Sequence, residues 1–261
     1  VGQLIRRTLD LGYRRIWIGL GGSLTVDLGL GALSALGMRF FDADGNRVAP
    51  CPETLAEIMK IDREELDPRI SQTEITLLYD VTAPLYGPDG ALRVFGPQKG
   101  ASDEQIAAWE QEFIRLAPLL SADPLAAGSG AAGGLGFALA SLGGILQNGS
   151  DLIFDRIGLS FALREADFVI TGEGKFDAQS IRFDKAPMAM LERFSNADRP
   201  GCLFVGRFDA DADALLREHP ALKGIAVCPV GDEPYETTVR ETFEQTVLPL
   251  IGKSVANMNG M

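Results

Sequence analysis

The chain has 261 residues, of which 46% are hydrophobic and 23% charged, a composition that excludes a disordered chain. Its net charge of −12 argues against a nucleic-acid partner, because phosphate backbones are bound by clustered Lys and Arg, although an acidic protein can still bind a nucleotide at a local site. The three cysteines are widely spaced and no run of about 18 apolar residues occurs, so we expect no disulfide framework, no zinc site, no membrane partner and a cytoplasmic location.

The first part of the chain is predicted to begin with a strand, glycine loop and helix unit. In chain order, apolar periodicity and turn residues predict a helix over residues 1–11, a strand over residues 15–20, a helix over residues 28–36 and an Asp-Gly turn between two short β-like runs within residues 38–48. The Gly-Gly-Ser sequence at residues 21–23 is a candidate for the opening of the second helix.

The middle of the chain contains a strand, a long loop and a capped helix. A helix is expected near residues 52–60, a strand over residues 74–81 and a Gly/Pro-rich loop over residues 82–100. Ser102 followed by Gln105 has the spacing of a capping box, so the next helix is expected to start there and to reach about residue 119. Residues 126–144 are dense in Gly and Ala, which indicates either close helix packing or close approach of the backbone to a ligand.

The last third of the chain changes to a repeating strand, turn and helix pattern. Residues 168–171, 202–206 and 224–228 are three candidates for buried strands, and the helical stretches between them are typical of a parallel sheet. We therefore predict an α/β protein with two domains, residues 1–166 and residues 167–261, and place the boundary near Ala166.

A first candidate site is the glycine turn after the first predicted strand. Gly21 and Gly22 would let the backbone approach an anion closely, and Ser23, Thr25 and Asp27 add two hydroxyl groups and a carboxylate. A tight strand-to-helix turn explains the glycines equally simply, and for this motif alone it is the favoured interpretation.

A second candidate site joins the end of a strand to the loop that follows it. Asp80 could bind magnesium or accept a proton from a substrate hydroxyl, and Lys99 could neutralise charge on a transferring phosphoryl group. Their separation suits one loop folded over a cleft. For an isolated Asp and Lys, a capped turn and a solvated lysine are the favoured interpretation.

A third candidate site is the loop over residues 171–180. It follows an apolar strand and precedes a helix, so its N–H groups could hold phosphate, with Lys175 as the cation and Glu173 or Asp177 near a metal ion. The spacings G-x-x-x-x-G-K-[ST] and G-x-G-x-x-G are both absent, so neither standard nucleotide fingerprint applies. Phosphate binding and a simple turn remain open for this loop.

The single histidine and the cysteines are not predicted to be catalytic. His219 precedes Pro220 near the expected end of a helix, which indicates a surface or capping residue. Cys51, Cys202 and Cys228 lie in apolar surroundings and are interpreted as small core residues.

Five motifs in a fixed order resemble the type I glycerate kinase family. The family pattern has G-I-G-G-S-A-T-N-D-G-G, D-V-T-N-P-L, V-F-G-P-Q-K-G-A, G-A-A-G-G-L-G and T-G-E-G-x-x-D-x-Q, and the corresponding segments here are residues 19–29, 80–85, 94–101, 130–136 and 171–179. The resemblance extends over residues 1 to about 190 and more faintly to the end.

The resemblance implies ATP-dependent phosphorylation of D-glycerate to a phosphoglycerate, with Mg²⁺ as a cofactor and with 2-phosphoglycerate favoured over the 3-isomer. It also implies two unlike α/β domains. Residues from about 167 onward would then be the C-terminal part of a flavodoxin-like parallel sheet, and the family's N-terminal segment with its S-F-K-G-S-L motif is expected to be missing. Whether the chain forms a homodimer is not decided by the sequence.

The resemblance also implies roles for individual residues. Asp80, Asp177, Lys99 and Lys175 are expected to be catalytic; Gly21, Gly22, Ser23, Thr25, Gly172, Glu173, Gly174 and Lys185 to bind ATP; and Asp27 and Glu173 to bind the metal ion. Either Asp80 or Asp177 would accept the proton of the glycerate hydroxyl, and both remain open.

Several residues depart from the family pattern inside these motifs. Leu24, Val26 and Leu28 replace Ala, Asn and Gly, Ala83 replaces Asn, and Asp184 replaces Gly. These changes motivate an alternative, a non-catalytic relative or fragment that retains at most ligand binding. A sugar-acid or hydroxy-acid dehydrogenase is a weaker alternative, because a dinucleotide fingerprint is lacking.

Overall fold

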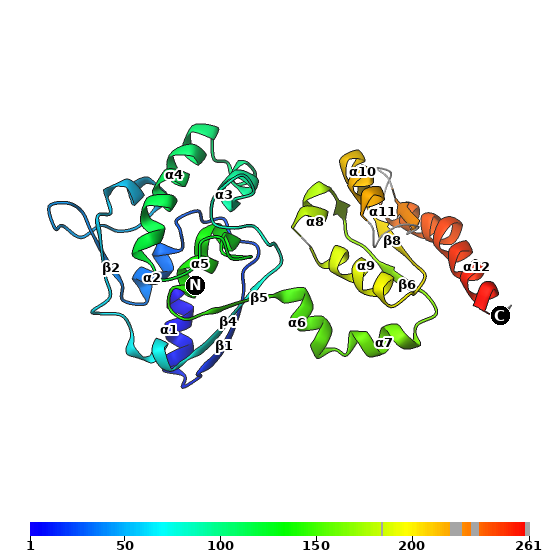
Figure 1. Ribbon diagram of the computed structural model, residues 1–261, viewed down its shortest axis with the longest axis horizontal. Coiled ribbons are helices and arrows are strands. Elements are labelled where there is room, and N and C mark those ends of the chain that lie inside the picture. Colours follow the sequence, from blue (N-terminus) through cyan, green and yellow to red (C-terminus); the bar gives the residue numbers. More distant parts are fainter. Residues whose placement is uncertain (184, 220–225, 231–234, 259–261) are drawn as a thin grey trace. The chain divides into compact units, whose positions relative to one another are not determined.

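The computed structural model describes residues 1–183, 185–219, 226–230 and 235–258, and these form a mixed α/β protein with several small sheets (Figure 1). The chain divides by its contacts into two compact units, Val1–Gly149 and Ser150–Met261. Each unit has its own buried hydrophobic clusters, so each is described by itself.

The first unit contains one parallel sheet and one short antiparallel ladder. Its helices are α1 (Gly2–Asp10), α2 (Leu30–Ala35), α3 (Ala91–Phe95), α4 (Asp103–Leu116) and α5 (Leu135–Ala140). Its strands are β1 (Arg15–Gly19), β2 (Arg39–Phe41), β3 (Lys60–Asp62), β4 (Glu74–Tyr79) and β5 (Ile145–Asn148). Short 3₁₀ turns cover Pro52–Glu57, Pro68–Gln72, Pro97–Lys99, Ala117–Leu119 and Ala131–Gly134.

The parallel sheet of the first unit has the strand order β1-β4-β5. Gly19 at the end of β1 pairs with Leu78 near the end of β4, and the Leu20 N–H donates to the Leu78 carbonyl oxygen at 2.8 Å. The carboxyl ends of these parallel strands therefore share one edge of the sheet. This places the glycine turn after β1 and Asp80 after β4 at the same edge, where ligands commonly bind in α/β proteins.

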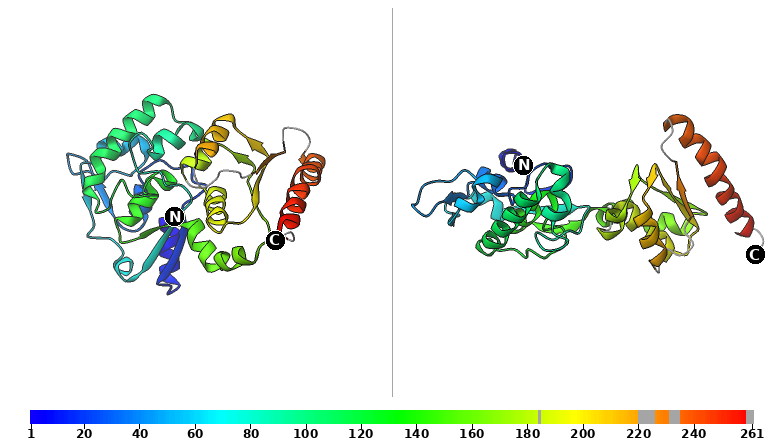
Figure 2. Two further views of the ribbon diagram at one scale, coloured as in Figure 1. Left: turned by 45° about the vertical axis from the view of Figure 1, so that its right-hand side comes forward. Right: turned by 90° about the horizontal axis from the view of Figure 1, so that it is seen from above.

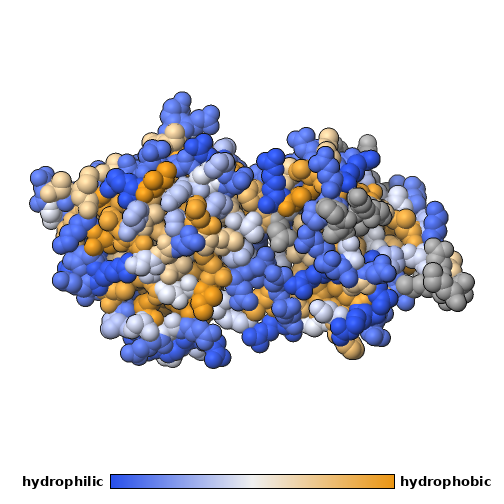
Figure 3. Space-filling view, viewed as in Figure 1, coloured by the Kyte–Doolittle hydropathy of each residue, from blue (hydrophilic) through white to orange (hydrophobic). Residues whose placement is uncertain are grey.

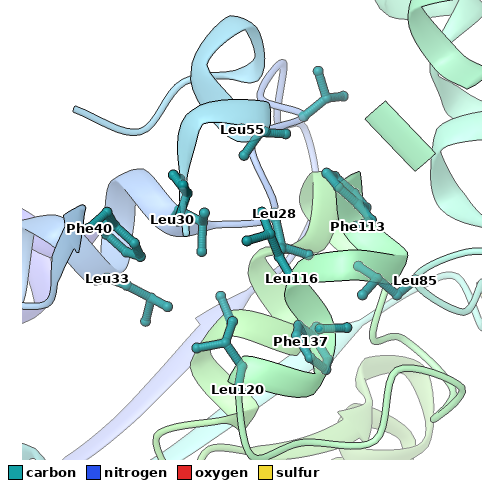
Figure 4. Packing of buried hydrophobic residues seen from close by; sticks show 14 of the residues in the cluster. Leu28, Leu30, Leu33, Phe40, Leu55, Leu85, Phe113, Leu116, Leu120 and Phe137 are labelled. Atoms are coloured by element: carbon teal, nitrogen blue, oxygen red, sulfur yellow. The ribbon is translucent and has the colours of Figure 1, made fainter. Parts of the chain in front are cut away.

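The main core of the first unit is built from segments far apart in sequence. Leu28 lies just before α2, Leu30 and Leu33 lie on α2, and Phe113 and Leu116 lie on α4; all five are fully buried in one cluster (Figure 4). Burying large side chains of this kind stabilises the fold by about 1.5–3 kcal/mol each. The core thereby holds the loop before α2 firmly against α4.

The second unit contains a three-stranded and a two-stranded parallel sheet, with orders β10-β8-β6 and β7-β9. Its strands are β6 (Val169–Thr171), β7 (Lys175–Phe176), β8 (Gly201–Val205), β9 (Arg207–Phe208) and β10 (Ala226–Pro229). Its helices are α6 (Gly149–Arg156), which starts at the unit boundary, α7 (Leu159–Glu165), α8 (Ala178–Arg182), α9 (Ala186–Asn196), α10 (Ala210–Glu218), α11 (Tyr235–Thr242) and α12 (Leu248–Met258).

A long helix covers β8 and β10. A π-helical turn, Phe243–Val247, joins α11 to α12, so that they run as one continuous helix (Figure 2). Val247 is buried in a cluster with Cys202 of β8 and Cys228 of β10, and the ring of Phe243 packs edge-on against Phe204. The predicted strand over residues 224–228 is seen from residue 226, because residues 224 and 225 lie outside the described part.

One local prediction for the first unit is wrong and another is confirmed. Residues 21–23 do not open α2: the helix begins at Leu30, and Asp27 accepts hydrogen bonds from its first turn. The Asp-Gly turn in residues 38–48 forms as predicted, closed by an antiparallel bridge between Phe41 and Arg47. In addition, β2 pairs antiparallel with β3, which the local turn signal did not indicate. Phe40 on β2 is buried in the core cluster while Ile61 of β3 packs against the same cluster, so tertiary packing selects the partner strand.

The division between units lies before the predicted domain boundary. Phe154 of α6 and Leu159 and Leu163 of α7 are buried in the same cluster as Val169 and Leu203, so residues 150–165 belong with the second unit by contacts. A domain boundary near Ala166 stays a prediction.

The surface combines polar residues with scattered apolar ones (Figure 3). Leu24, in the glycine turn, is one of the most exposed large hydrophobic side chains, at 83%. Within the residues described, no helix is both long and apolar enough to cross a membrane.

Candidate functional site

The structure distributes the predicted site residues over the two units. Those in the first unit are Gly21, Gly22, Ser23, Thr25, Asp27, Asp80 and Lys99, and those in the second are Gly172, Glu173, Gly174, Lys175, Asp177 and Lys185. Asp184, which departs from the family pattern, lies outside the described residues.

In the first unit, Lys99 contacts the glycine turn directly. The Lys99 Nζ donates a hydrogen bond to the Thr25 carbonyl oxygen at 3.0 Å, across 74 residues of sequence. The hydroxyl groups of Ser23 and Thr25 lie 3.1 Å apart in the same turn. Two motifs that the sequence presented separately are therefore parts of one surface.

The glycines of this turn leave the backbone open. A side chain at Gly21 or Gly22 would meet no atom within 4 Å, so packing does not require glycine at either position. Gly22 has φ +66°, a conformation that favours glycine, and both residues are exposed. The turn thus presents bare backbone to solvent at the end of a parallel strand.

The start of α2 holds Asp27 in place, and the negative charge of Asp27 acts on the Lys99 ammonium group. Its Oδ1 accepts the Gly29 N–H at 3.1 Å and its Oδ2 accepts the Gly31 N–H at 3.0 Å. Burial lowers the pKa of Lys99, and the negative charge of Asp27 opposes this shift without cancelling it. A partly buried lysine with a depressed pKa, next to a fixed carboxylate, is a common feature of functional sites.

The Gly- and Ala-rich segment supports the same turn from behind. A Cβ on Gly133 would lie 1.9 Å from the Thr25 carbonyl oxygen, and one on Gly134 would lie 2.8 Å from the Cα of Leu28. Of the two interpretations of this segment, close packing of backbone on backbone is the one that the structure shows. Thr25 therefore touches both the glycine segment and Lys99.

A buried ion pair supports the segment that carries Lys99. The carboxylate of Glu110, on α4, is only 3% exposed; it accepts hydrogen bonds from the Arg93 guanidinium and from the Gly87 N–H, the latter at 3.2 Å. Arg93 lowers the pKa of Glu110 more than burial raises it, and the Gly87 N–H lowers it further. Because α3 leads directly into the turn with Lys99, this pair fixes both the start and the middle of the segment.

Asp80 is placed by the sheet alone. It is exposed immediately after β4, at the edge that the glycine turn shares.

Thr25 and Asp27 also line a cavity of about 280 Å³, whose other walls come from the first turn of α1, from α2 and from Leu135.

In the second unit, the predicted loop packs tightly against the turn after β8. A Cβ on Gly172 would lie 1.6 Å from the Phe204 carbonyl oxygen, so only glycine fits there. The Gly206 N–H donates to the Glu173 carbonyl oxygen at 3.1 Å, and the Arg207 N–H donates to that of Gly174 at 2.9 Å. These bonds fix the backbone from which Glu173 and Lys175 extend.

The side chains of this loop converge on one buried hydroxyl group. The Ser180 Oγ donates to Glu173 Oε1 at 2.7 Å and lies 3.3 Å from Asp177 Oδ1. The Lys185 Nζ lies 3.5 Å from the same hydroxyl and 3.7 Å from Asp177 Oδ1. Two carboxylates, a hydroxyl and an ammonium group thus meet at one point.

Asp177 is an ionised cap in this cluster. Partial burial raises the pKa of its carboxyl, but Lys185, the Ser180 N–H and Lys175 together lower it further, so the pKa lies below its ordinary value of 3.8. Its Oδ1 accepts the Ser180 N–H at 3.1 Å and caps α8. Phosphate binding in this loop would therefore depend on lysine side chains and loop N–H groups more than on the capped helix N-terminus.

Lys175 is neutralised from two sides. Its Nζ lies 2.9 Å from Asp209 Oδ2 and 3.6 Å from Asp177 Oδ2. The hydrogen bond to Asp209 is the main cause of a raised pKa for Lys175. The predicted cation is therefore held by the two carboxylates that follow the paired strands β7 and β9.

Three of the four residues that depart from the family pattern in the first unit are buried, whereas the fourth, Leu24, is exposed and its change has no structural explanation. Val26, Leu28 and Ala83 are all buried, and Val26 and Leu28 belong to the core cluster. Leu28 has φ +57°, a left-handed conformation that favours glycine, while its side chain is buried in the core. These changes exchange polar or small groups for core packing.

Three residues of the two sites are absent from the sequence prediction: Glu110, Ser180 and Asp209. The spacing of Asp177 and Ser180 is that of an N-cap and the third helical residue, which is a detectable signal. Glu110 is one of several acidic residues on α4, and Asp209 follows β9 with no motif around it. No sequence signal distinguishes those two.

The carboxylates of Glu173 and Asp177 fit a magnesium ion only if a bound phosphate ligand and water supply further oxygen atoms. Among the residues described, no group of three or more His, Cys, Asp or Glu side chains could hold a metal ion. Glu173 and Asp177, joined through one hydroxyl, nevertheless form an oxygen donor set of the size that Mg²⁺ uses when phosphates and water supply the other positions.

The fold is that of a mixed α/β protein whose glycine turns, lysines and carboxylates lie at the carboxyl ends of parallel strands, where ligands commonly bind in such proteins. The model of the glycerate kinase family matches residues 1–246. The chain therefore belongs to the glycerate kinase family, as its five motifs predicted.

Individual relatives agree with this assignment. The chain is 38% identical over 221 residues to a glycerate kinase of Haemophilus influenzae and 40% identical over 224 residues to a glycerate 2-kinase of Escherichia coli. These matches cover 82% and 84% of this chain but 58% of each relative. A crystal structure assigned as glycerate kinase 2 of Salmonella typhimurium LT2 aligns with a TM-score of 0.69 and 35% identity, covering 99% of this chain and 68% of that one. The chain thus spans somewhat more than half the length of the curated relatives.

Proposed function

We propose that the protein containing this chain transfers a phosphoryl group from ATP to D-glycerate, with 2-phosphoglycerate as the product. The observation that carries the proposal is the cluster in the second unit, where Lys175 and Lys185 lie beside the carboxylates of Glu173 and Asp177. Family membership supplies the substrate, since the relatives are glycerate kinases. The name of the Escherichia coli relative favours the 2-isomer.

The residues of the second unit would act mainly by neutralising charge. Phosphoryl transfer has a loose transition state, so positioning and electrostatic stabilisation supply most of the rate enhancement. Lys175 and Lys185 would balance the charge of the ATP phosphates, and the N–H groups around Gly172 and Gly174 would orient them. Glu173 and Asp177 would hold Mg²⁺, which when bound neutralises phosphate charge.

The residues of the first unit would handle the acceptor and the transferred group. The open backbone at Gly21 and Gly22, with the hydroxyl groups of Ser23 and Thr25, suits a small anionic hydroxy acid or a phosphate. Lys99 would stabilise negative charge that develops during transfer. Asp27 would keep Lys99 charged, a role in addition to the predicted one of metal ligand.

The proton acceptor is proposed to be Asp80 rather than Asp177. The lysines beside Asp177 lower its pKa, which makes it a weaker proton acceptor, whereas Asp80 is exposed at the sheet edge that carries the glycine turn. Comparing Asp80→Asn with Asp177→Asn tests this choice. Loss of the acidic limb of the pH profile of kcat in Asp80→Asn, but not in Asp177→Asn, supports it, and the reverse result contradicts it.

We also propose the finer architecture that the family resemblance implies: two unlike α/β domains, residues 1–166 and 167–261, with the second contributing to a flavodoxin-like parallel sheet. The parallel order β10-β8-β6 supports this assignment.

The decisive experiment is coupled ADP release by the full reading frame with ATP, Mg²⁺ and D-glycerate. Glycerate-dependent ADP release supports the proposal. A non-catalytic relative is the second candidate, favoured by the apolar Val26 and Ala83 at positions where the family pattern has amides. Calorimetric binding of ATP or D-glycerate without turnover would identify that case and exclude the kinase.

A further inference from the structure

Ser180 is a buried polar residue at the centre of the second-unit cluster. Its side chain is fully buried, with 0% of the residue exposed, although it is one residue of a short, five-residue helix. It lies within hydrogen-bonding distance of Glu173, Asp177 and Lys185. No other side chain among the described residues of this loop touches all three.

The hydroxyl of Ser180 has one proton, and the distances indicate where it goes. The contact with Glu173 Oε1, at 2.7 Å, is that of a strong O–H to carboxylate bond, whereas the contact with Asp177 Oδ1 is 3.3 Å long. Asp177 is already held by the Ser180 backbone N–H. The hydroxyl oxygen remains free to accept, and the Asp177 N–H at 3.4 Å and the Lys185 Nζ at 3.5 Å are the donors that face it.

We propose that Ser180 is a positioning residue that orients the Glu173 carboxylate toward a nucleotide-bound Mg²⁺ ion. The inference rests on the proposed kinase function, because the role of Glu173 as a ligand of Mg²⁺ is part of that proposal. The backbone of Glu173 is fixed, but both of its neighbours in the chain are glycines, so neither offers a side chain that would restrain the Glu173 carboxylate. The Ser180 hydroxyl fixes one carboxylate oxygen and leaves the lone pairs of the other for the metal.

The consequence is a specific defect in metal use. Partners that orient a metal ligand without touching the metal change affinity or activity by about 10–100-fold when removed. Ser180→Ala should therefore raise the Mg²⁺ concentration for half-maximal activity by about 10-fold. Ser180→Thr keeps the donor and should restore the Mg²⁺ dependence.

The test uses the full-length protein and a double-mutant cycle with Glu173→Gln. If Ser180 acts through Glu173, then adding Ser180→Ala to Glu173→Gln changes the Mg²⁺ dependence no further. Multiplicative effects of the two substitutions, or an unchanged Mg²⁺ dependence in Ser180→Ala, would overturn the proposal. Ser141→Ala is the matched control, because Ser141 is also a buried serine, which donates to the Ala138 carbonyl oxygen in the first unit.

Two further measurements keep the test decisive. If Ser180→Ala does not fold, Glu173→Asp is used instead, because its shorter side chain moves the carboxylate away from the unchanged Ser180 hydroxyl. An unchanged Mg²⁺ dependence in Glu173→Asp overturns the proposal. Calorimetry of Mg–ATP binding to the wild type and to Ser180→Ala separates this inference from the kinase function. A wild-type protein that binds Mg–ATP without turnover contradicts only the kinase function, whereas a Mg–ATP affinity that is unchanged in Ser180→Ala overturns the inference. A wild-type protein that does not bind Mg–ATP contradicts both.

Discussion

Lys99 is a charged side chain that the fold buries in part, and this partial burial disfavours its charged form. Burial lowers its pKa below the ordinary 10.5, and the charge of Asp27 offsets only part of that effect. Its Nζ donates a hydrogen bond to a backbone carbonyl oxygen, that of Thr25. A lysine kept in such a place contributes more to chemistry than to stability.

Replacing Lys99 should therefore separate activity from stability. We expect Lys99→Met to lower kcat by about 100-fold or more, since it removes a cation from the transferring phosphoryl group, while the free energy of unfolding at neutral pH does not fall. The unfolded chain binds the lysine proton more tightly than the folded one. The stability that the protein loses by partly burying the charged Lys99 is therefore lost in full below the folded pKa, and this loss disappears as the pH rises above 10.5.

The measurement is turnover together with urea unfolding at pH 7 and near pH 10. As the pH rises, the free energy of unfolding of the wild type should increase relative to that of Lys99→Met. A clear loss of stability at pH 7 would show instead that Lys99 is mainly a structural residue. Arg115→Met is not a suitable control, because Arg115 holds the carbonyl oxygens of Leu55 and Ile58; Lys60→Met, at an exposed position of β3, is suitable.

At the scale of elements, the turn before α2 depends on the glycine segment behind it. Gly133 combines φ +68° with a position where a Cβ would lie 1.9 Å from the Thr25 carbonyl oxygen. Gly133→Ala should destabilise the first unit by about 3 kcal/mol or more, because strain and a backbone clash add together. It should also displace Thr25 and lower activity.

Gly143 provides the matched control for this prediction. It has φ +92° but a Cβ there would meet open space, so Gly143→Ala carries only the conformational penalty of about 1 kcal/mol. Urea unfolding of both variants measures the difference. Equal losses of stability would mean that the close approach at Gly133 is relieved by a small backbone shift.

The Arg93–Glu110 pair makes an asymmetric prediction. The Arg93 side chain is 52% exposed and that of Glu110 only 4%, so removing the arginine leaves a buried carboxylate, whereas removing the carboxylate leaves an arginine that can reach water. Arg93→Met should destabilise by about 2–3 kcal/mol and Glu110→Gln by about 1 kcal/mol at pH 7. Glu112→Gln, which removes a carboxylate that is more exposed than that of Glu110 on the same helix, should change stability by less than about 0.5 kcal/mol.

The pH dependence of this pair follows from the sign of the shift. The folded pKa of Glu110 lies below its ordinary 4.5, so the pair contributes stability above that pH and loses it as the pH falls through the folded value. The difference in free energy of unfolding between wild type and Arg93→Met, measured with urea, should therefore become smaller below pH 4.5. A gap that is constant from pH 7 to acid would assign the effect to packing of the arginine stem.

Features set by local sequence were predictable, and features set by distant contacts were not. The capping box of Ser102 and Gln105 and the strands β1 and β4 follow from spacing within a few residues. The pairing of β2 with β3 depends on core packing around Phe40, which local turn signals do not contain. For the same reason the motifs indicated Lys99 and the glycine turn, while the hydrogen bond that joins them became visible only in the fold.

At the scale of the whole molecule, the buried clusters described divide between the two units. Leu139 is fully buried with Leu77 and Leu135 in the first unit, and Leu203 is fully buried with Phe176 and Leu191 in the second. Cores that share no residues are expected to unfold as separate cooperative units unless ligands couple them. Calorimetry should therefore show two thermal transitions in the absence of ligand.

Substitutions in each core assign these transitions. Leu139→Ala and Leu203→Ala should each destabilise their own unit by about 2–5 kcal/mol, the usual effect of truncating a buried leucine. We expect Leu139→Ala to lower one transition temperature and Leu203→Ala the other, with each partner transition unchanged. If Mg–ATP binds the second-unit cluster, it should raise the transition that Leu203→Ala lowers. A single transition that both substitutions shift together would show that the two units fold as one cooperative body.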